Sequence, residues 1–248
     1  MGRLLKWIAY AILTCVVVSV LAVVALRWVN PASSAFMLEN RLNALSAGDR
    51  AYRTDYDWVD LENISPHAAI AVVASEDQQF PFHAGFDFKS IRESVRASES
   101  GKKKKMRGAS TISQQVAKNL FLWNGRSFVR KGLEAWLTVV MEATWPKERI
   151  LEMYLNIAQF GRGVYGVQAA SRRFFHKPAS RLTSSEAATL AAVLPNPISM
   201  HAGRPSAYVS ERREQILRQM RALGGASYLQ ALESESRQPS IRKARSLN

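Results

Sequence analysis

The stretch 108–134 of the 248-residue chain combines small residues, amides, cations and one carboxylate. In its first half, three aliphatic residues recur every four positions, as on one face of a helix: Ile112, Val116 and Leu120. Polar residues occupy a separate face of that helix: Thr111, Gln115, Lys118 and Asn119. Gly108 and Ser110 stand at its start, where free backbone N–H groups and the helix dipole favour an anion such as phosphate. This pattern predicts an anion-binding helix.

A second helical pattern follows, and its charges stand at helical spacing. Arg130 and Lys131 lie four and three residues before Glu134, so two cations and one carboxylate share one side of this helix. The alternative interpretation is a pair of amphipathic helices whose polar faces are only solvated. The residues of this stretch leave both interpretations open.

Two adjacent carboxylates end another predicted helix. Ser65 and Pro66 have the pattern of an N-cap followed by proline at the first helical position, and residues 67–80 continue as a nearly all-apolar helix. Such a helix belongs in a core, so Glu76 and Asp77 reach the end of a buried element, where desolvation and mutual repulsion raise a carboxyl pKa. A general base could arise in this way. The alternative is a pair that ends the helix at the surface.

The composition favours one catalytic domain with an anionic partner. A chain of this length with 47% hydrophobic residues can bury one sizeable core and a smaller lobe. Its net charge of +14 indicates nucleic acid, anionic lipid headgroups or a phosphorylated substrate as partner. Cys15 is the single cysteine and cannot form an intrachain disulfide, and the four histidines lack metal-ligand spacing. We therefore expect no metal site made by the protein alone.

An apolar run at 7–29 is long enough to cross a bilayer as a helix. Arg3 and Lys6 precede it, so the positive-inside rule predicts that residues 1–6 lie in the cytoplasm and that the remainder is exported. The competing interpretation is a cleavable signal peptide with its site near 31–35, although the apolar core is longer than is usual for one. We favour an uncleaved anchor.

The remaining stretches predict scaffold. Residues 30–64 are mixed and polar and are interpreted as a linker with a short helix at 35–46, and 65–225 as the catalytic domain. Helical patterns cover most of this domain: 147–160, 167–175, 187–194 and 206–223. Residues 160–166 are a glycine-rich turn between two of these helices. Because no strand-period run of any strength is present, the fold class is predicted to be mainly α.

Three smaller features concern charge and capping. Thr183 and Glu186 have the spacing of a capping box, so starting a helix is the preferred role of Glu186. The basic loop 98–108 contains four consecutive lysines and either rests on anionic headgroups or is a solvated charge run. Residues 226–248 are interpreted as a frayed, basic C-terminal tail.

Five blocks, in order along the exported region, resemble the peptidoglycan glycosyltransferases of glycosyltransferase family 51. They lie at residues 76–87, 108–119, 130–134, 150–166 and 186–197. They include EDQQF at 76–80 and GASTISQQ at 108–115. The chain is most similar to the monofunctional, membrane-anchored biosynthetic form of these enzymes. Ser113 stands where many members have threonine, a difference that keeps the hydroxyl group.

The resemblance implies a fold and a reaction. The fold is a lysozyme-like helical lobe plus a smaller membrane-facing jaw lobe, with a substrate groove between them, and here one N-terminal transmembrane helix. The reaction polymerises lipid II, the undecaprenyl-pyrophosphoryl disaccharide-pentapeptide, into β-1,4-linked glycan and releases undecaprenyl pyrophosphate. Inversion at the anomeric carbon is expected, because no covalent intermediate intervenes.

The resemblance also implies roles for two carboxylates and a set of binding residues. Glu76 is the expected general base, and Glu134 is the second carboxylate, which orients the cations of the donor site. The expected substrate-binding residues are those of the matching blocks and the cations near them: Asp77, Phe80, His83, Gly108, Ser110, Thr111, Gln115, Lys118, Asn119, Arg126, Arg130 and Lys131. Such cations and donors would stabilise the departing pyrophosphate. No cofactor is required by the sequence, although a divalent ion such as Mg²⁺ or Mn²⁺ could bridge the pyrophosphate.

These expectations extend to location and partners. The chain is expected in the cell inner membrane as a single-pass protein with a periplasmic catalytic domain. Its expected partners are lipid II, the growing glycan strand, the anionic membrane surface and other proteins of cell-wall synthesis or division. Nucleic acid is disfavoured because the domain is exported. Two rival functions are a peptidoglycan-cleaving muramidase or lytic transglycosylase, and a non-enzymatic, membrane-tethered basic scaffold.

Overall fold

The structure is a computed structural model that describes residues 2–88, 92, 110–125 and 127–232. Several predictions lie outside the described residues: the basic loop 98–108 with Gly108, the side chain of Arg126, and residues 233–248 of the basic tail. In the described part helices dominate, and short strands account for little of the chain, so the predicted mainly α fold class is confirmed.

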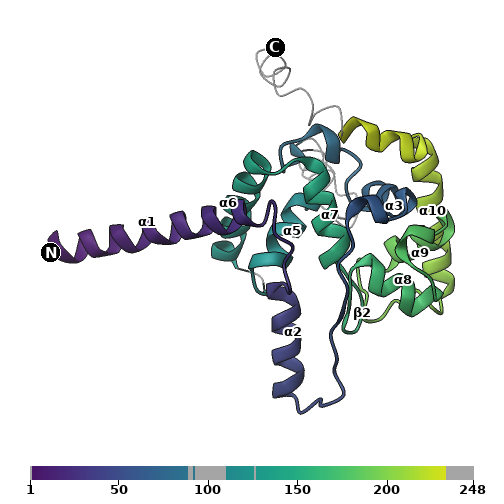
Figure 1. The fold of residues 1–248 in the computed structure, drawn as a ribbon, viewed down its shortest axis with the longest axis horizontal. Helices are drawn as coiled ribbons and strands as arrows, with labels where there is room; N and C mark the ends of the chain where they lie inside the picture. The colour runs from purple at the N-terminus through teal and green to yellow at the C-terminus, as the bar shows by residue number, and fades with distance from the viewer. Residues whose placement is uncertain (1, 89–91, 93–109, 126, 233–248) are drawn as a thin grey trace, which may run out of the picture.

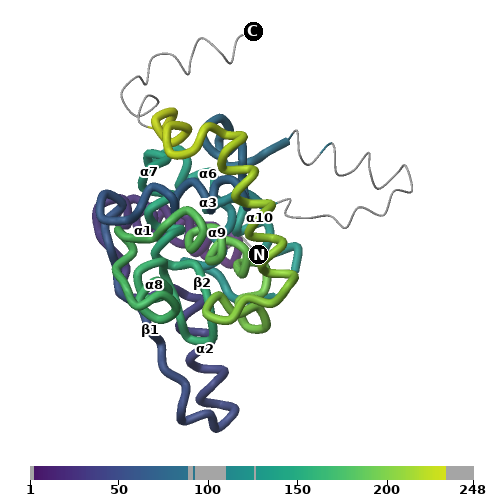
Figure 2. The backbone as a smooth tube through the Cα atoms, turned by 90° about the vertical axis from the view of Figure 1, so that its right-hand side faces the viewer, coloured from purple at the N-terminus to yellow at the C-terminus, as the bar shows by residue number. Residues whose placement is uncertain are grey.

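The helices pack in two groups, with α1 (Gly2–Ala25) projecting from the body of the molecule (Figure 1). One group combines α3 (Pro66–Glu76), α9 (Ser184–Val193) and α10 (Ala207–Ala222), which contact one another and lie side by side in Figure 2. In the other group α5 (Ile112–Phe121) packs on α6 (Phe128–Thr144) and α7 (Lys147–Ile157). The remaining helices complete the fold: α2 (Ala35–Ser46), α8 (Val167–Phe175), η1 (Leu61–Asn63), η2 (Phe80–Phe82), η3 (Ala179–Arg181) and η4 (Gly225–Leu229).

Helix α3 is the buried helix that carries the two adjacent carboxylates. Its N-cap is Ser65, whose hydroxyl accepts the His67 N–H, and Pro66 opens the helix as predicted. Residues 68–74 are all buried, so burial on every side explains its apolar sequence. The helix ends at Glu76, four residues before the predicted end at 80, because the backbone of Asp77 leaves the helical conformation (φ −159°, ψ 79°). The carboxylates therefore stand where the chain leaves the core.

Helix α5 has the apolar stripe expected from its sequence. Ile112, Val116 and Leu120 are buried against α6 and α7. Thr111 is its N-cap and forms a capping box with Gln114, in which each side chain bonds the backbone N–H of the other. This reciprocal cap fixes the first turn of the helix that lines the pocket described below.

Three short strands are present in the described part of the chain, although the sequence contains no strand-period run of any strength. They are β1 (Asp55–Tyr56), β2 (Gln159–Gly161) and β3 (Val164–Tyr165), in the order β1-β3-β2, with β1 parallel and β2 antiparallel to β3. The glycine-rich segment is thus a hairpin, and α7 ends at Ile157 because the chain turns into β2. Strands of two or three residues are too short to show an alternating pattern.

The stretch 30–64 is held against the body by tertiary contacts. Strand β1 pairs with β3, and the side-chain amide of Asn156 bonds both backbone groups of Val59. The Tyr56 hydroxyl donates to the carbonyl of Pro31. The predicted helix at 35–46 is confirmed as α2. The segment interpreted as a linker is therefore part of the folded body, an outcome that its mixed polar sequence did not indicate.

Helix α1 contains the candidate membrane span. Residues Arg3–Ala25 form the one helix, among the residues the structure describes, that is long and apolar enough to cross a bilayer. The helix begins before the predicted run 7–29 and ends four residues before Val29. It fits a single-pass membrane anchor.

Hydrogen bonds join the last turns of α1 to α6 and to Trp145, the residue that follows α6. The indole N–H of Trp136 donates to Ser19 Oγ at 3.1 Å, and that of Trp145 donates to the carbonyl of Val23 at 2.8 Å. Beyond the helix, an Arg27 guanidinium nitrogen donates to the carbonyl of Thr144 at 2.6 Å. These bonds align part of α6 with the end of the anchor.

Two glycines with positive φ offer a matched test of the hairpin. A Cβ at Gly166 (φ +81°) would lie 2.6 Å from the carbonyl oxygen of Asn156, whereas one at Gly48 (φ +73°) would meet nothing within 4 Å. We expect Gly48→Ala to lower the free energy of unfolding by about 1–2 kcal/mol through backbone strain alone. Gly166→Ala should lower it by about 2–5 kcal/mol, because overlap with backbone is added. Thermal unfolding in detergent measures both, and equal losses would contradict the steric argument.

Candidate active site

A polar pocket of about 670 Å³ opens between α5 and the first half of α6. Six of its lining residues were predicted as site residues: Ser110, Gln115, Lys118, Arg130, Lys131 and Glu134. Three more were not predicted: Gln114, Asn124 and Gly125. Asn124 and Gly125 lie between the two helices, in a connection whose sequence gave no periodic signal. The two halves of the stretch 108–134 thus face one another across one cavity.

The carboxylate of Glu134 holds two of the pocket cations. Its Oε2 accepts from an Arg130 guanidinium nitrogen at 2.8 Å, and its Oε1 accepts from the ammonium group of Lys131. Glu134 is only 2% exposed, so the pair of cations keeps its charge compensated inside the protein. The predicted grouping of these three residues on one side of a helix is confirmed.

Two donors of the pocket lack a partner within the described part of the chain. Arg130 Nε is buried and makes no hydrogen bond there. Lys118 takes part in none of the ion pairs or side-chain hydrogen bonds there, and burial lowers the pKa of its ammonium group. The nearby charge of Glu134 raises that pKa, while Arg130 and Lys131 lower it. An anion entering the pocket would satisfy Arg130 Nε and offset the repulsion among the cations.

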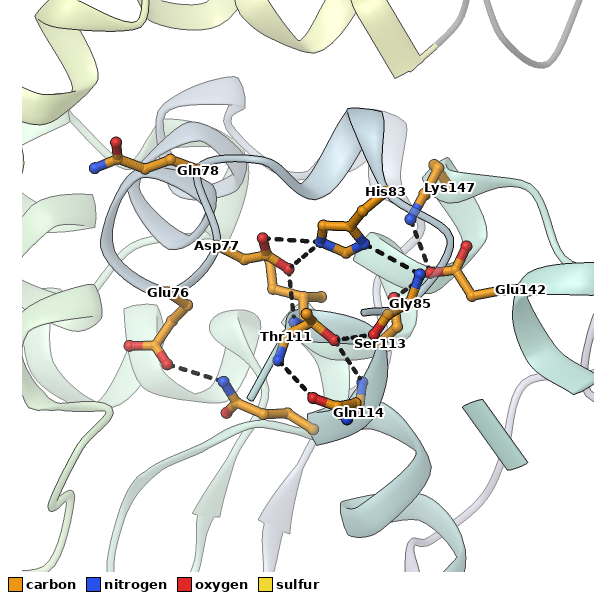
Figure 3. A network of polar contacts seen from close by, with 12 residues as sticks. Glu76, Asp77, Gln78, His83, Gly85, Thr111, Ser113, Gln114, Glu142 and Lys147 are labelled. Atoms are coloured by element: carbon orange, nitrogen blue, oxygen red, sulfur yellow. Dashed lines mark hydrogen bonds and ion pairs between the residues drawn. The ribbon is translucent and has the colours of Figure 1, made fainter. Parts of the chain in front are cut away.

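Glu76 adjoins this pocket through one lining residue. The Gln115 amide nitrogen donates to Glu76 Oε2 at 2.9 Å. Figure 3 draws this bond as the dashed line at the Glu76 carboxylate. Burial raises the pKa of Glu76 above its usual 4.5, and the charge of Asp77 raises it further. The Gln115 hydrogen bond and the charges of Arg212 and Lys118 act in the opposite direction. The prediction of a carboxyl group with a raised pKa at the end of a buried helix is confirmed.

Asp77 faces the N-terminus of α5 and the ring of His83 (Figure 3). Its Oδ2 accepts the Ile112 N–H at 3.0 Å, and both its oxygens lie 3.0 Å from His83 Nε2. Because His83 Nδ1 accepts the Gly85 N–H at 3.1 Å, Nε2 carries the proton and donates to Asp77. An internal carboxylate therefore neutralises part of this helix start. The phosphate site expected at Gly108 and Ser110 stays a prediction, because Gly108 lies outside the described residues.

Five predicted binding residues do not line this pocket. Phe80 is 0% exposed beneath the ammonium group of Lys147, which is 4.5 Å from its ring centroid. Thr111 donates to the carbonyl of Gly85 and caps α5. Asn119 and Asp77 are buried and His83 is half-buried, and none of the three lines the pocket. In the part of the chain that the structure describes, these five side chains make contacts within the protein and do not line this pocket, and their role in substrate binding stays a prediction.

The predictions overlooked two sets of buried polar contacts near the pocket. Ser113 Oγ donates to Glu142 Oε1, which also accepts from the Lys147 ammonium group at 2.8 Å. The Tyr154 hydroxyl donates to Gln115 Oε1 at 3.2 Å. Tyr154 lies in the helical stretch 147–160, which is interpreted from the sequence as scaffold. A buried tyrosine hydroxyl usually needs a hydrogen-bond partner, and this requirement could have indicated a polar contact at Tyr154 from the sequence.

Similarity to known proteins identifies the family. The family model described as Transglycosylase matches residues 42–221, which is most of the chain. The chain belongs to this family. It is therefore an enzyme of the glycosyltransferase class.

Three relatives support the same assignment, and each carries the name biosynthetic peptidoglycan transglycosylase. One from Xanthomonas campestris pv. campestris (strain B100) is 53% identical over 229 residues, covering 92% of each chain. One from Klebsiella oxytoca is 57% identical over 198 residues, covering 80% of this chain and 81% of the relative. One from Pectobacterium carotovorum subsp. carotovorum (strain PC1) is 50% identical over 234 residues, covering 93% and 96%. The resemblance seen in the five sequence blocks is confirmed.

The raised pKa of Glu76 makes the stability of the protein depend on pH. The folded protein holds the Glu76 proton more tightly than the unfolded chain, so stability falls as pH rises from 4.5 through the folded pKa. In Glu76→Gln this pH-dependent loss of stability is absent, because the amide does not ionise. The new side-chain oxygen can still accept the hydrogen bond from Gln115. We expect the variant to unfold at a higher temperature than the wild type at pH 7, with the difference closing below pH 4.5.

Thermal unfolding in detergent across this pH range provides the measurement. Glu62→Gln, at an exposed carboxylate away from the pocket, is the matched control. A Glu76→Gln variant that is less stable than the wild type at pH 7 would contradict the burial argument.

Proposed function

We propose that this enzyme is a peptidoglycan glycan-chain polymerase. It transfers the growing lipid-pyrophosphoryl glycan onto the sugar hydroxyl of lipid II, forms β-1,4 links with inversion, and releases undecaprenyl pyrophosphate. The observation that carries the proposal is the joining of Glu76 to a pocket of cations by Gln115. The family match and the names of the relatives support the same reaction.

In this reaction Glu76 acts as the general base. Its Oε2 accepts from Gln115, and within the described residues no hydrogen bond occupies its Oε1. Oε1 takes the proton of the acceptor hydroxyl while that oxygen attacks the anomeric carbon of the donor chain. The bond from that carbon to the pyrophosphate oxygen breaks, and its electron pair leaves with the pyrophosphate. Attack and departure on opposite faces give the inverted, β-linked product.

The cations stabilise the charge that develops on the leaving group. Lys118, Arg130 and Lys131 all line the pocket, and Arg130 Nε is a buried donor that lacks a partner among described atoms. Preorganised cations in a partly desolvated site stabilise a departing pyrophosphate more strongly than water does. Glu134 fixes two of these cations in place, so we assign it to orienting the donor site.

The position of the pocket suits a lipid-linked substrate. The pocket residues of α6 lie in its first half, and Trp136, two residues after Glu134, donates a hydrogen bond to Ser19 of α1. The same half of α6 exposes apolar side chains, Phe128, Val129 and Leu133. With α1 in a bilayer, these side chains would meet acyl chains and the cations would meet headgroup phosphates. We propose the inner membrane with a cytoplasmic N-terminus and a periplasmic catalytic domain, following the positive-inside rule.

A polymerisation assay tests the reaction. The wild type, given lipid II in detergent, should make products that lengthen with time. Glu76→Gln should reduce the rate by about 10²–10⁴-fold, the usual contribution of a general base. Glu134→Gln should also reduce it, because Arg130 and Lys131 lose their shared partner. Gel separation of labelled glycan gives the lengths and the rates.

One control variant and three contrary outcomes accompany the polymerisation assay. Glu186→Gln keeps the capping box of α9 and should leave the rate unchanged. Shortening of preformed glycan without lengthening of lipid II would favour a lytic enzyme. An unchanged polymerisation rate in Glu76→Gln would contradict the assignment of Glu76 as general base. If the wild type neither lengthens nor cleaves glycan, a non-enzymatic scaffold is favoured.

A resident metal does not fit the donor set of the pocket. Among the residues described by the structure, no group of three or more His, Cys, Asp and Glu side chains could hold an ion. Both oxygens of Glu134, the carboxylate that lines the pocket, accept from cations. We propose that a divalent ion such as Mg²⁺ or Mn²⁺ is not required, and that one present would bind mainly through substrate phosphates.

Chelation tests this proposal. Polymerisation should remain measurable after treatment with EDTA, because the protein cations already neutralise the leaving group. The rate of lipid II consumption with and without EDTA gives the comparison. Loss of all activity, restored by Mg²⁺ or Mn²⁺, would contradict the proposal.

A further inference from the structure

Three side chains from three helices form a directed chain of hydrogen bonds that ends at Glu76. Tyr154 of α7 donates from its hydroxyl to Gln115 Oε1 of α5 at 3.2 Å. The amide nitrogen of Gln115 donates to Oε2 of Glu76, the last residue of α3, at 2.9 Å. Tyr154 is 2% exposed and does not line the pocket, so it lies behind the residues that would meet substrate.

The direction of this chain follows from its donors and acceptors. An amide has one acceptor end and one donor end, and an ionised carboxylate only accepts. Burial, together with the negative charges of Glu76 and Asp77, raises the pKa of the Tyr154 phenol well above its usual value, so the phenol keeps its proton. A phenol that donates to Oε1 of Gln115 leaves only the amide nitrogen to face Glu76.

We propose that Tyr154 is a positioning residue that locks the Gln115 amide with its nitrogen toward Glu76. The proposal rests on the proposed role of Glu76 as general base. The lock holds Oε2 of that carboxylate and leaves Oε1 for the acceptor proton. It also favours the ionised form of Glu76, since the amide donates to it, and this opposes the effect of burial.

Without the hydroxyl, the amide can turn and present its oxygen to the carboxylate. The amide oxygen of Gln115 then faces a carboxylate oxygen of Glu76. This contact disfavours the ionised form of Glu76 and turns its carboxylate away from the acceptor hydroxyl. Tyr154→Phe should therefore shift the acid limb of the kcat/KM pH profile of lipid II polymerisation to higher pH. The turnover number near neutral pH should fall about tenfold, as expected for one lost hydrogen bond to a charged group. KM should change little, because Tyr154 lies outside the pocket lining.

Tyr228→Phe is the matched control. Its hydroxyl donates to the backbone carbonyl of Gln78 at 2.6 Å, two residues beyond Glu76, and makes no hydrogen bond to Gln115. Both substitutions remove one tyrosine hydroxyl near the end of α3. Only Tyr154→Phe should move the pH profile.

Gln115→Met is the second variant and removes both amide contacts at similar side-chain length. It should shift the acid limb in the same direction, and adding Tyr154→Phe to it should move the profile little further, because the two residues act as one unit. If Tyr154→Phe does not fold, the Gln115→Met profile decides the question. An acid limb that stays at its wild-type position in either folded variant overturns the proposal, even if the melting temperature falls.

Glu76→Gln, measured alongside, separates this inference from the proposed function. If Glu76→Gln retains polymerisation, the base assignment fails and the positioning role fails with it. If Glu76→Gln is inactive while Tyr154→Phe keeps the wild-type pH profile, only the positioning role of Tyr154 is lost.

Discussion

The structure depends on the junction between the end of α3 and the start of α5. Two consecutive carboxylates stand at this junction and face different partners: Asp77 takes the Ile112 N–H at the start of α5, and Glu76 takes the Gln115 amide one turn further along. The first bond is structural, since it neutralises a helix N-terminus inside the protein. The second leaves its carboxylate beside the cationic pocket. One helix thus aligns both carboxylates, and a shift of α5 would disturb both.

The two carboxylates of the site, Glu134 and Glu76, are both shielded from solvent but differ in the groups that surround them. Glu134 is buried and forms ion pairs with two cations, Arg130 and Lys131. Glu76 has no such ion pair among the described residues, so burial raises its pKa and only a neutral amide bonds it. In the reaction that we propose, Glu134 therefore orders the cations, while Glu76 exchanges a proton. This division of roles follows from environment and not from residue type.

The sequence predicted the parts of the site that depend on local spacing. The buried stripe of α5, the cap and proline of α3, and the grouping of Arg130 and Lys131 with Glu134 all follow from residues within one or two turns. It did not predict that Asp77 would fill the start of α5 or that Tyr154 would contact Gln115, because these partners are 35 and 39 residues apart. The same limit applies to β1, whose partner β3 lies about a hundred residues away.

The anchor is also a structural member of the fold. Val23 in α1 is 0% exposed and belongs to the same apolar core as Met141 and Trp145 of the catalytic body. Deleting the anchor to obtain a water-soluble enzyme would open that core and uncover an apolar strip along α6. Such a truncated protein would tend to self-associate through the uncovered strip. Detergent or lipid that replaces the lost helix would therefore act as a structural component of the protein.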